Sequence, residues 1–172
     1  MFYKNILETV PIYAFGILSL FSGLLIYDAV MYAAFNTFFT CVPIFYFAVF
    51  DFEYPKEVLA RRPRLYHIGI EDLHFNKWVF WRWAFYGVWQ STLILLVAYY
   101  CLEGNSANSN GMFGGISVPS NLTFCMLVIV SNMKILISSY RINLWLVLLV
   151  VVSVALYFFV YIAQSLAAKT TD

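Results

Sequence analysis

The sequence predicts an all-α membrane protein, a bundle of five membrane-spanning helices with one water-facing block of charge. The first observation is the composition: 63% of the 172 residues are hydrophobic and 20% are aromatic, more than ordinary soluble domains use. The second is that most charged residues lie together within 51–82, between long apolar runs in which a charge is rare. Such runs are too long for a globular core and indicate a multi-pass integral membrane protein.

The first apolar run predicts two spans. Residues 9–50 contain a single charged residue, Asp28, and a bilayer core of about 30 Å takes a helix of about 20 residues. We therefore expect spans at about 5–26 and 29–50, joined by a turn that ends at Asp28. Pro11 should kink the first span and free a carbonyl one turn earlier.

The charged block at 51–82 sets the expected topology. Its basic residues are Lys56, Arg61, Arg62, Arg64, Lys77 and Arg82. Lys and Arg near span ends resist translocation, so we expect this block in the cytoplasm. The arginine cluster could also bind anionic headgroups, but we favour orientation and ion pairing with the block's own glutamates.

Three further spans are expected at about 83–102, 122–140 and 143–165. The loop at 103–120 is rich in Asn, Ser and Gly and contains no Lys or Arg, which predicts a lumenal or extracellular location. It is followed by a glycosylation sequon, Asn121-Leu122-Thr123. The closeness of this sequon to the next span argues against its occupancy.

Charge and cysteine usage exclude other classes of function. The net charge of +1 argues against a nucleic-acid partner, which requires a basic face. The three cysteines lie inside apolar runs without metal-ligand spacing, and His67 and His74 have no Cys or third His nearby. We therefore expect no metal site and no catalytic residue, and interpret the cysteines as small buried hydrophobes.

Four groups of short motifs follow one another along nearly the whole chain. They are Phe2-Tyr3-Lys4-Asn5 with Pro11 and Phe21-Ser22-Gly23; Tyr27-Asp28 with Asn36, Phe39-Thr40 and Pro43; Phe50-Asp51 with Pro63, Leu65-Tyr66 and Gly69; and Asn132 and Lys134 with Ile142-Asn143 and Leu156-Tyr157-Phe158. In this order the motifs resemble the phospholipid flippases, the type IV branch of the P-type ATPases. One departure is Phe52-Glu53-Tyr54-Pro55, where that family usually has Gln-Asp-Val and a small residue.

The resemblance implies that the chain is the C-terminal membrane region of a flippase, comprising the fifth to ninth of ten helices. Such a pump moves phospholipid through an aspartyl-phosphate cycle, which implies ATP and magnesium as cofactors of the complete pump. The sequence contains no Asp-Lys-Thr-Gly-Thr motif and no soluble region long enough for a nucleotide domain. We therefore expect no cofactor in this chain. The implied partners are phospholipid and the remaining pump domains or other membrane subunits.

Two alternatives remain open. The chain could be a non-catalytic structural subunit of a larger membrane complex, derived from such helices. An unrelated small channel or carrier fits the predicted topology but not the ordered motifs. In each case we expect no ATP hydrolysis by this chain alone.

By the same resemblance, Lys4, Asn5 and Asn36 are candidates for the path of the lipid headgroup. Lys4 would counter a phosphate or carboxylate, and the two asparagines would supply neutral hydrogen bonds. The alternative is that Lys4 snorkels to the cytoplasmic surface. Lys134 is a second intramembrane cation, and burying one costs about 2.5–3.5 kcal/mol. We interpret it as a structural clamp between helices, paired with Glu8 or with a freed backbone carbonyl.

Overall fold

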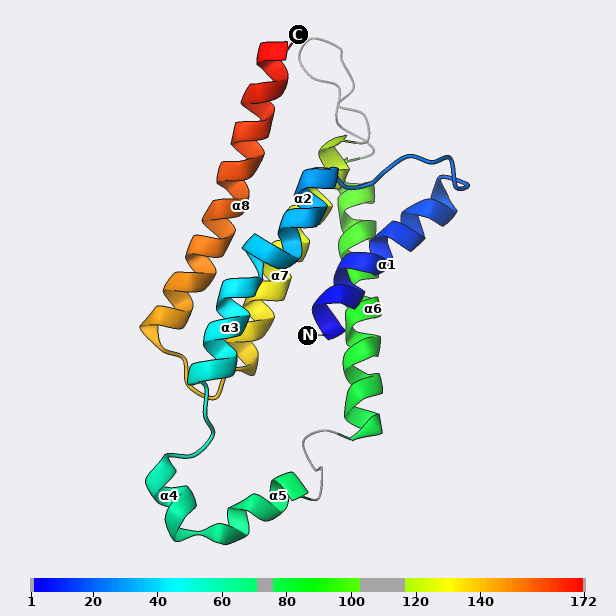
Figure 1. Ribbon diagram of the computed structural model, residues 1–172. Helices are drawn as coiled ribbons and strands as arrows, with labels where there is room; N and C mark the ends of the chain where they lie inside the picture. Colours follow the sequence, from blue (N-terminus) through cyan, green and yellow to red (C-terminus); the bar gives the residue numbers. More distant parts are fainter. Residues whose placement is uncertain (1, 71–75, 103–116, 172) are drawn as a thin grey trace.

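The computed structural model describes residues 2–70, 76–102 and 117–171, which are helical apart from short connections (Figure 1). The elements are α1 (Phe2–Leu18), α2 (Ala29–Ala34), a π-helical segment (Phe35–Phe39), α3 (Cys41–Phe50), α4 (Lys56–Arg61), a 3₁₀ turn (Pro63–Tyr66), α5 (His67–Ile70), α6 (Lys77–Leu102), α7 (Ser117–Ser138) and α8 (Leu144–Thr171). The all-helical prediction is confirmed for this part of the chain. His74 and most of the loop at 103–120 lie outside the described residues.

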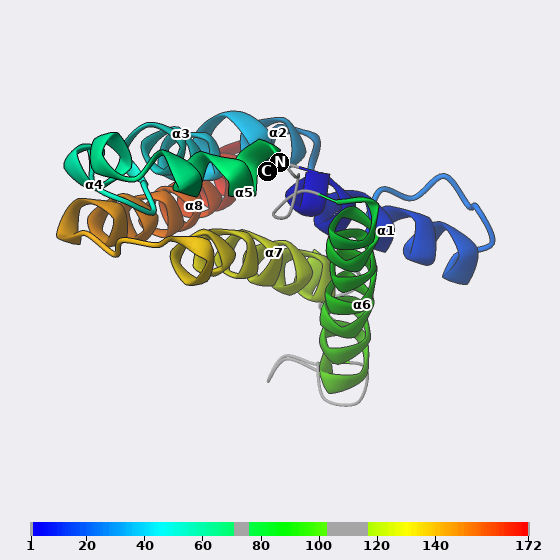
Figure 2. The ribbon, with the colours of Figure 1, turned by 90° about the horizontal axis from the view of Figure 1, so that it is seen from below.

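Three stretches are long and apolar enough to cross a membrane, namely Ala29–Phe50, Ser117–Ser138 and Leu144–Ala167. They lie side by side, because α3 and α7 each pack along α8 (Figure 1, Figure 2). The helices α1 and α6 pack against each other beside this layer, and α6 also packs against α7. The short helices α4 and α5 lie together at one end of the bundle (Figure 1).

The first helix is shorter than the span expected at 5–26. α1 ends at Leu18, and the chain then reverses through Phe21 and Gly23, whose φ angles are 53° and 80°. Such left-handed backbone cannot continue an α-helix. The Phe21 amide donates to the Gly16 carbonyl at 2.7 Å and closes the last turn.

The stretch Ala29–Phe50, hereafter the second span, is a broken helix. It begins at Asp28, whose carboxylate accepts hydrogen bonds from the amides of Val30 and Met31 at 2.9 and 3.2 Å, as an N-cap does. α2 then widens into the π-helical segment, and α3 starts after Thr40, whose φ of −131° is not helical. The second span therefore changes direction near its middle.

Pro43 adds to this break and is compensated from another helix. Because proline has no amide N–H, it leaves the carbonyl of Phe39, four residues earlier, without its helical donor. Asn132 on α7 supplies the missing donor, since its Nδ2 lies 3.0 Å from that carbonyl oxygen. Asn132 is fully buried, so the break in one span is tied to the interior of the next.

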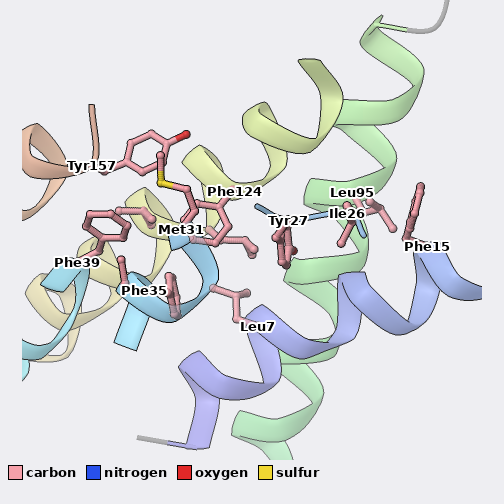
Figure 3. Packing of buried hydrophobic residues seen from close by; sticks show 13 residues of the cluster. Leu7, Phe15, Ile26, Tyr27, Met31, Phe35, Phe39, Leu95, Phe124 and Tyr157 are labelled. Atoms are coloured by element: carbon pink, nitrogen blue, oxygen red, sulfur yellow. The ribbon is translucent and has the colours of Figure 1, made fainter. Parts of the chain in front are cut away.

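An aromatic cluster fills the core where α7, α8 and the second span meet (Figure 3). Phe124 on α7 lies at its centre, with ring centroids 5.1 Å from Tyr27, 5.8 Å from Phe35 and 5.9 Å from Tyr157. Most of these pairs have T-shaped geometry, which the ring quadrupoles favour. The cluster holds the π-helical segment in place.

Asp51, just after α3, fixes the short connection between α7 and α8. Its carboxylate accepts hydrogen bonds from the Ser139 hydroxyl at 3.1 Å and from the amides of Tyr140 and Arg141 at 3.1 and 3.0 Å. The Arg141 guanidinium lies 4.4 Å from the centroid of the Phe52 ring. One carboxylate thus joins the ends of three helices.

Candidate functional site

Two pairs of polar side chains join α1 to the second span. Lys4 Nζ donates to Thr40 Oγ1 at 2.9 Å, and Asn36 Nδ2 donates to Glu8 Oε2 at 3.1 Å. Lys4 and Glu8 are one turn apart on α1, and Asn36 and Thr40 are similarly spaced on the second span, so the two pairs lie one above the other. We call these four residues the polar seam.

The break in the second span positions the two polar-seam residues that lie on this span, Asn36 and Thr40. The Thr40 hydroxyl donates to the carbonyl of Phe35 at 2.9 Å while accepting from Lys4, as one hydroxyl can. Asn36 lies within the π-helical segment. Segments of this kind recur at functional sites because they reorient side chains and free backbone groups.

Glu8 is a buried member of the polar seam, at 2% exposed. Its Oε2 accepts from Asn36, whereas Oε1 has no hydrogen-bond partner among the described residues. A buried acceptor without a donor is costly, so the seam has capacity for one more donor. Asn36 is exposed, so the seam reaches the surface of the described bundle.

Asn5, the third candidate for the headgroup path, lies outside the polar seam. It follows Lys4 on α1 and is exposed, and its carbonyl accepts a hydrogen bond from the Thr9 hydroxyl at 2.7 Å. The structure therefore brings Lys4 and Asn36 to one interface between α1 and the second span. It does not bring Asn5 there.

Lys134 on α7 lies among aromatic rings rather than beside Glu8. Its Nζ is 4.8 Å from the centroid of the Trp83 ring and 5.7 Å from those of Tyr3 and Tyr86. An ammonium over a ring face is attracted by the ring quadrupole, by about 0.5–2 kcal/mol depending on desolvation. These rings belong to α1 and α6, so the contacts of Lys134 join three helices.

Lys134 and Lys4 also line a common cavity of about 490 Å³. It lies between the start of α1, the end of α3, the start of α6 and the end of α7, and most of its lining side chains are apolar. Thr40, Trp83 and Ser131 also line this cavity. Glu8 and Asn36 are not part of its lining.

Sequence reasoning treated Thr40 and Asn132 only as motif positions and did not identify their contacts. Pro43 was the available signal, because a proline inside a span leaves an earlier carbonyl in need of a donor. The residue that supplies this donor could not be named without knowing which helices are neighbours.

The comparison that decides the family covers nearly the whole chain. A family model described as "Phospholipid-translocating P-type ATPase C-terminal" matches residues 1–171. The chain belongs to this family. The resemblance drawn from the four motif groups is thus confirmed. Together with the three apolar stretches, membership in this family of phospholipid-translocating ATPases makes the chain a multi-pass integral membrane protein.

Curated relatives are similar to most of this chain. Phospholipid-transporting ATPase DNF1 of Chaetomium thermophilum is 31% identical over 155 residues, which cover 88% of this chain and 10% of the relative. Phospholipid-transporting ATPase IH of Mus musculus is 27% identical over 143 residues, 81% of this chain and 12% of the relative. A Plasmodium falciparum protein named Guanylate cyclase alpha is 26% identical over 144 residues, 84% of this chain and 3% of the relative. The chain therefore spans only 3–12% of the length of these three relatives.

The described residues offer no ligand set for the magnesium that the family name implies for a complete pump. Within residues 2–70, 76–102 and 117–171, no group of three His, Cys, Asp or Glu side chains could hold a metal ion. The polar seam offers one carboxylate, whereas magnesium requires near-octahedral oxygen coordination.

Proposed function

We propose that this chain is the membrane-embedded C-terminal part of an ATP-driven phospholipid flippase, and that the polar seam lines the path of the lipid headgroup. Membership in the family supports the first statement. The second rests on one observation: two hydrogen-bonded polar pairs meet at a π-helical break within an otherwise apolar span. Polar groups at membrane depth are expensive, and they commonly mark a transport path.

The chemistry of a phospholipid headgroup matches the polar seam. Lys4 uses one of its three ammonium donors on Thr40, so it retains donors for a phosphate oxygen. Glu8 Oε1, which lacks a partner, would accept from an ammonium or hydroxyl group of the headgroup. The Asn36 side chain would form hydrogen bonds with polar atoms of the headgroup in place of the water molecules that the headgroup leaves behind. The substrate class is therefore a phospholipid whose headgroup carries both a phosphate and a hydrogen-bond donor.

We further propose that α1 and α6 complete a set of five spans. α6 has 26 residues, a length of about 39 Å at about 1.5 Å per residue, which exceeds a bilayer core of about 30 Å. α1 has 17 residues, about 26 Å, and a span this short is accommodated by local thinning of the bilayer. The charged block at 51–82 would then face the cytoplasm.

The test is the substitution Asn36→Ala in the complete pump that contains this chain. It should lower lipid-stimulated ATPase turnover by about tenfold or more, because a charge-linked hydrogen bond along the path is lost. Thr37→Ala is the matched control, since Thr37 is the adjacent exposed position of the same π-helical segment, and it should leave turnover unchanged. A loss of protein yield with normal turnover per molecule would instead show that Asn36 has a packing role and does not line the path.

A further inference from the structure

The cavity of about 490 Å³ combines apolar walls with two ammonium groups. Phe47, Val79 and Ile135 are among the apolar side chains that line it, and Lys4 and Lys134 contribute the charges. Its volume lies within the range of about 300–1,000 Å³ that is usual for sites of small molecules. It lies at the end of the bundle that carries the basic helix α4 (Figure 1).

Within the described part of the chain, the ammonium group of Lys134 has no oxygen acceptor. Its contacts are with the rings of Tyr3, Trp83 and Tyr86 at 4.8–5.7 Å, and no described residue accepts a hydrogen bond from it. A lysine carries three N–H donors, and rings satisfy the charge better than they satisfy these donors. The rings are held in place, since the Tyr3 hydroxyl donates to the Gln90 side chain. The aromatic side chains therefore orient an ammonium group that still needs an acceptor.

We propose that this cavity binds an anionic lipid of the surrounding leaflet, with its phosphate or carboxylate between Lys4 and Lys134 and its hydrocarbon against the apolar walls. Two positive charges on one cavity favour an anion between them, and the walls favour one with a covalently attached apolar tail. A free inorganic phosphate would leave oxygens unpaired against apolar side chains, which is costly. The cavity shares Lys4 and Thr40 with the polar seam but not Glu8 and Asn36, so the proposal rests in part on the proposed function. It adds Lys134 as a second cation, and its test needs no transport.

The test is lipid binding by the full 172-residue chain in phosphatidylcholine nanodiscs, followed by native mass spectrometry. The probes are dioleoyl phosphatidate, dioleoyl phosphatidylcholine and inorganic phosphate. The wild-type chain should retain one phosphatidate, with an affinity at least about tenfold above that for phosphatidylcholine, and millimolar inorganic phosphate should not displace it. Equal retention of both lipids, or displacement by inorganic phosphate, would overturn the proposal.

Variants of this chain locate the site. Lys134→Gln should weaken phosphatidate binding by about tenfold or more, whereas Lys134→Arg should retain it. Lys56→Gln, in the exposed helix α4, is the matched control and should bind as the wild type does. Ser138→Phe keeps both lysines but places an aromatic ring at a position that lines the cavity. This variant should lose phosphatidate binding, and it tests the site even if Lys134→Gln does not fold. Unchanged phosphatidate binding by the Ser138→Phe chain would contradict the assignment.

Discussion

At the residue scale, the break in the second span depends on two residues on different helices. Pro43 removes an amide donor, and Asn132 replaces it with a side-chain donor 3.0 Å from the Phe39 carbonyl. Asn132 Nδ2 also lies 2.9 Å from the Val128 carbonyl of its own helix. In a membrane, where water cannot satisfy a freed carbonyl, such compensation is required. Pro43 and Asn132 therefore act as one unit.

This pairing predicts a coupling between two substitutions. Asn132→Ala should lower the free energy of unfolding by about 1–3 kcal/mol, because a buried carbonyl loses its donor. The same change in a Pro43→Ala background should cost about 1 kcal/mol less, because alanine restores the backbone amide. Unfolding in mixed micelles by a denaturing detergent measures all four proteins of the cycle. Additive costs would show that Asn132 does not compensate for Pro43.

The sequence suggested candidate site residues but did not fix which side chains contact one another. Lys4 and Asn36 stand out in a sequence because polar groups are rare in spans, and the structure brings both to the same interface. For Lys134 the sequence left Glu8 and a freed backbone carbonyl open as partners; its described contacts are with aromatic rings, and Glu8 pairs with Asn36. The rotation of each helix about its axis decides such partners, and sequence alone does not fix it.

At the scale of elements, α1 and α6 approach closely because Gly87 has no side chain. A Cβ at this position would lie 3.0 Å from Ile6 Cγ2 and 3.5 Å from the Tyr3 carbonyl oxygen. Small residues permit such contacts between membrane helices. The same contact positions Tyr3 beside Trp83, with ring centroids 5.8 Å apart, and so supports the aromatic rings around Lys134.

The close approach predicts that Gly87→Val separates α1 from α6. Overpacking of this kind costs about 1–3 kcal/mol, so the Tm of the purified chain in detergent should fall. Gly69→Val is the matched control, because a Cβ there meets no atom within 4 Å. Equal shifts of Tm for the two variants would mean that the contact between α1 and α6 is not tight.

Helix type was predictable at this scale, whereas helix ends were not. The long apolar runs were correctly assigned as helices. The end of α1 at Leu18 depends on left-handed backbone at Leu20 and Phe21, and few non-glycine residues take that conformation. Because Leu18, Leu20 and Phe21 are all apolar, the sequence gives no sign that the helix ends there. The π-helical segment was also missed; Phe35 and Phe39 within it are buried in the core cluster, and such packing cannot be read from the sequence.

At the scale of the whole molecule, the proposed five spans place the two ends of the bundle in different compartments. This predicts asymmetric labelling by a membrane-impermeant maleimide in a background without the native Cys41, Cys101 and Cys125. In sealed membrane vesicles, Glu57→Cys, exposed in α4, and Ser22→Cys, exposed in the turn after α1, should react from opposite sides of the membrane. Reaction of both cysteines from the same side would rule out an odd number of spans between them.

The proposed headgroup path can be tested without any substitution. A phospholipid with a photoreactive diazirine on its headgroup is supplied to the complete pump, with and without ATP, and the labelled peptides are mapped by mass spectrometry. The polar seam predicts ATP-dependent labelling of residues 4–8 and 35–40, and no increase on the exposed face of α8 around Val151. Labelling that is equal with and without ATP, or that is confined to α8, would contradict passage of the headgroup along the polar seam.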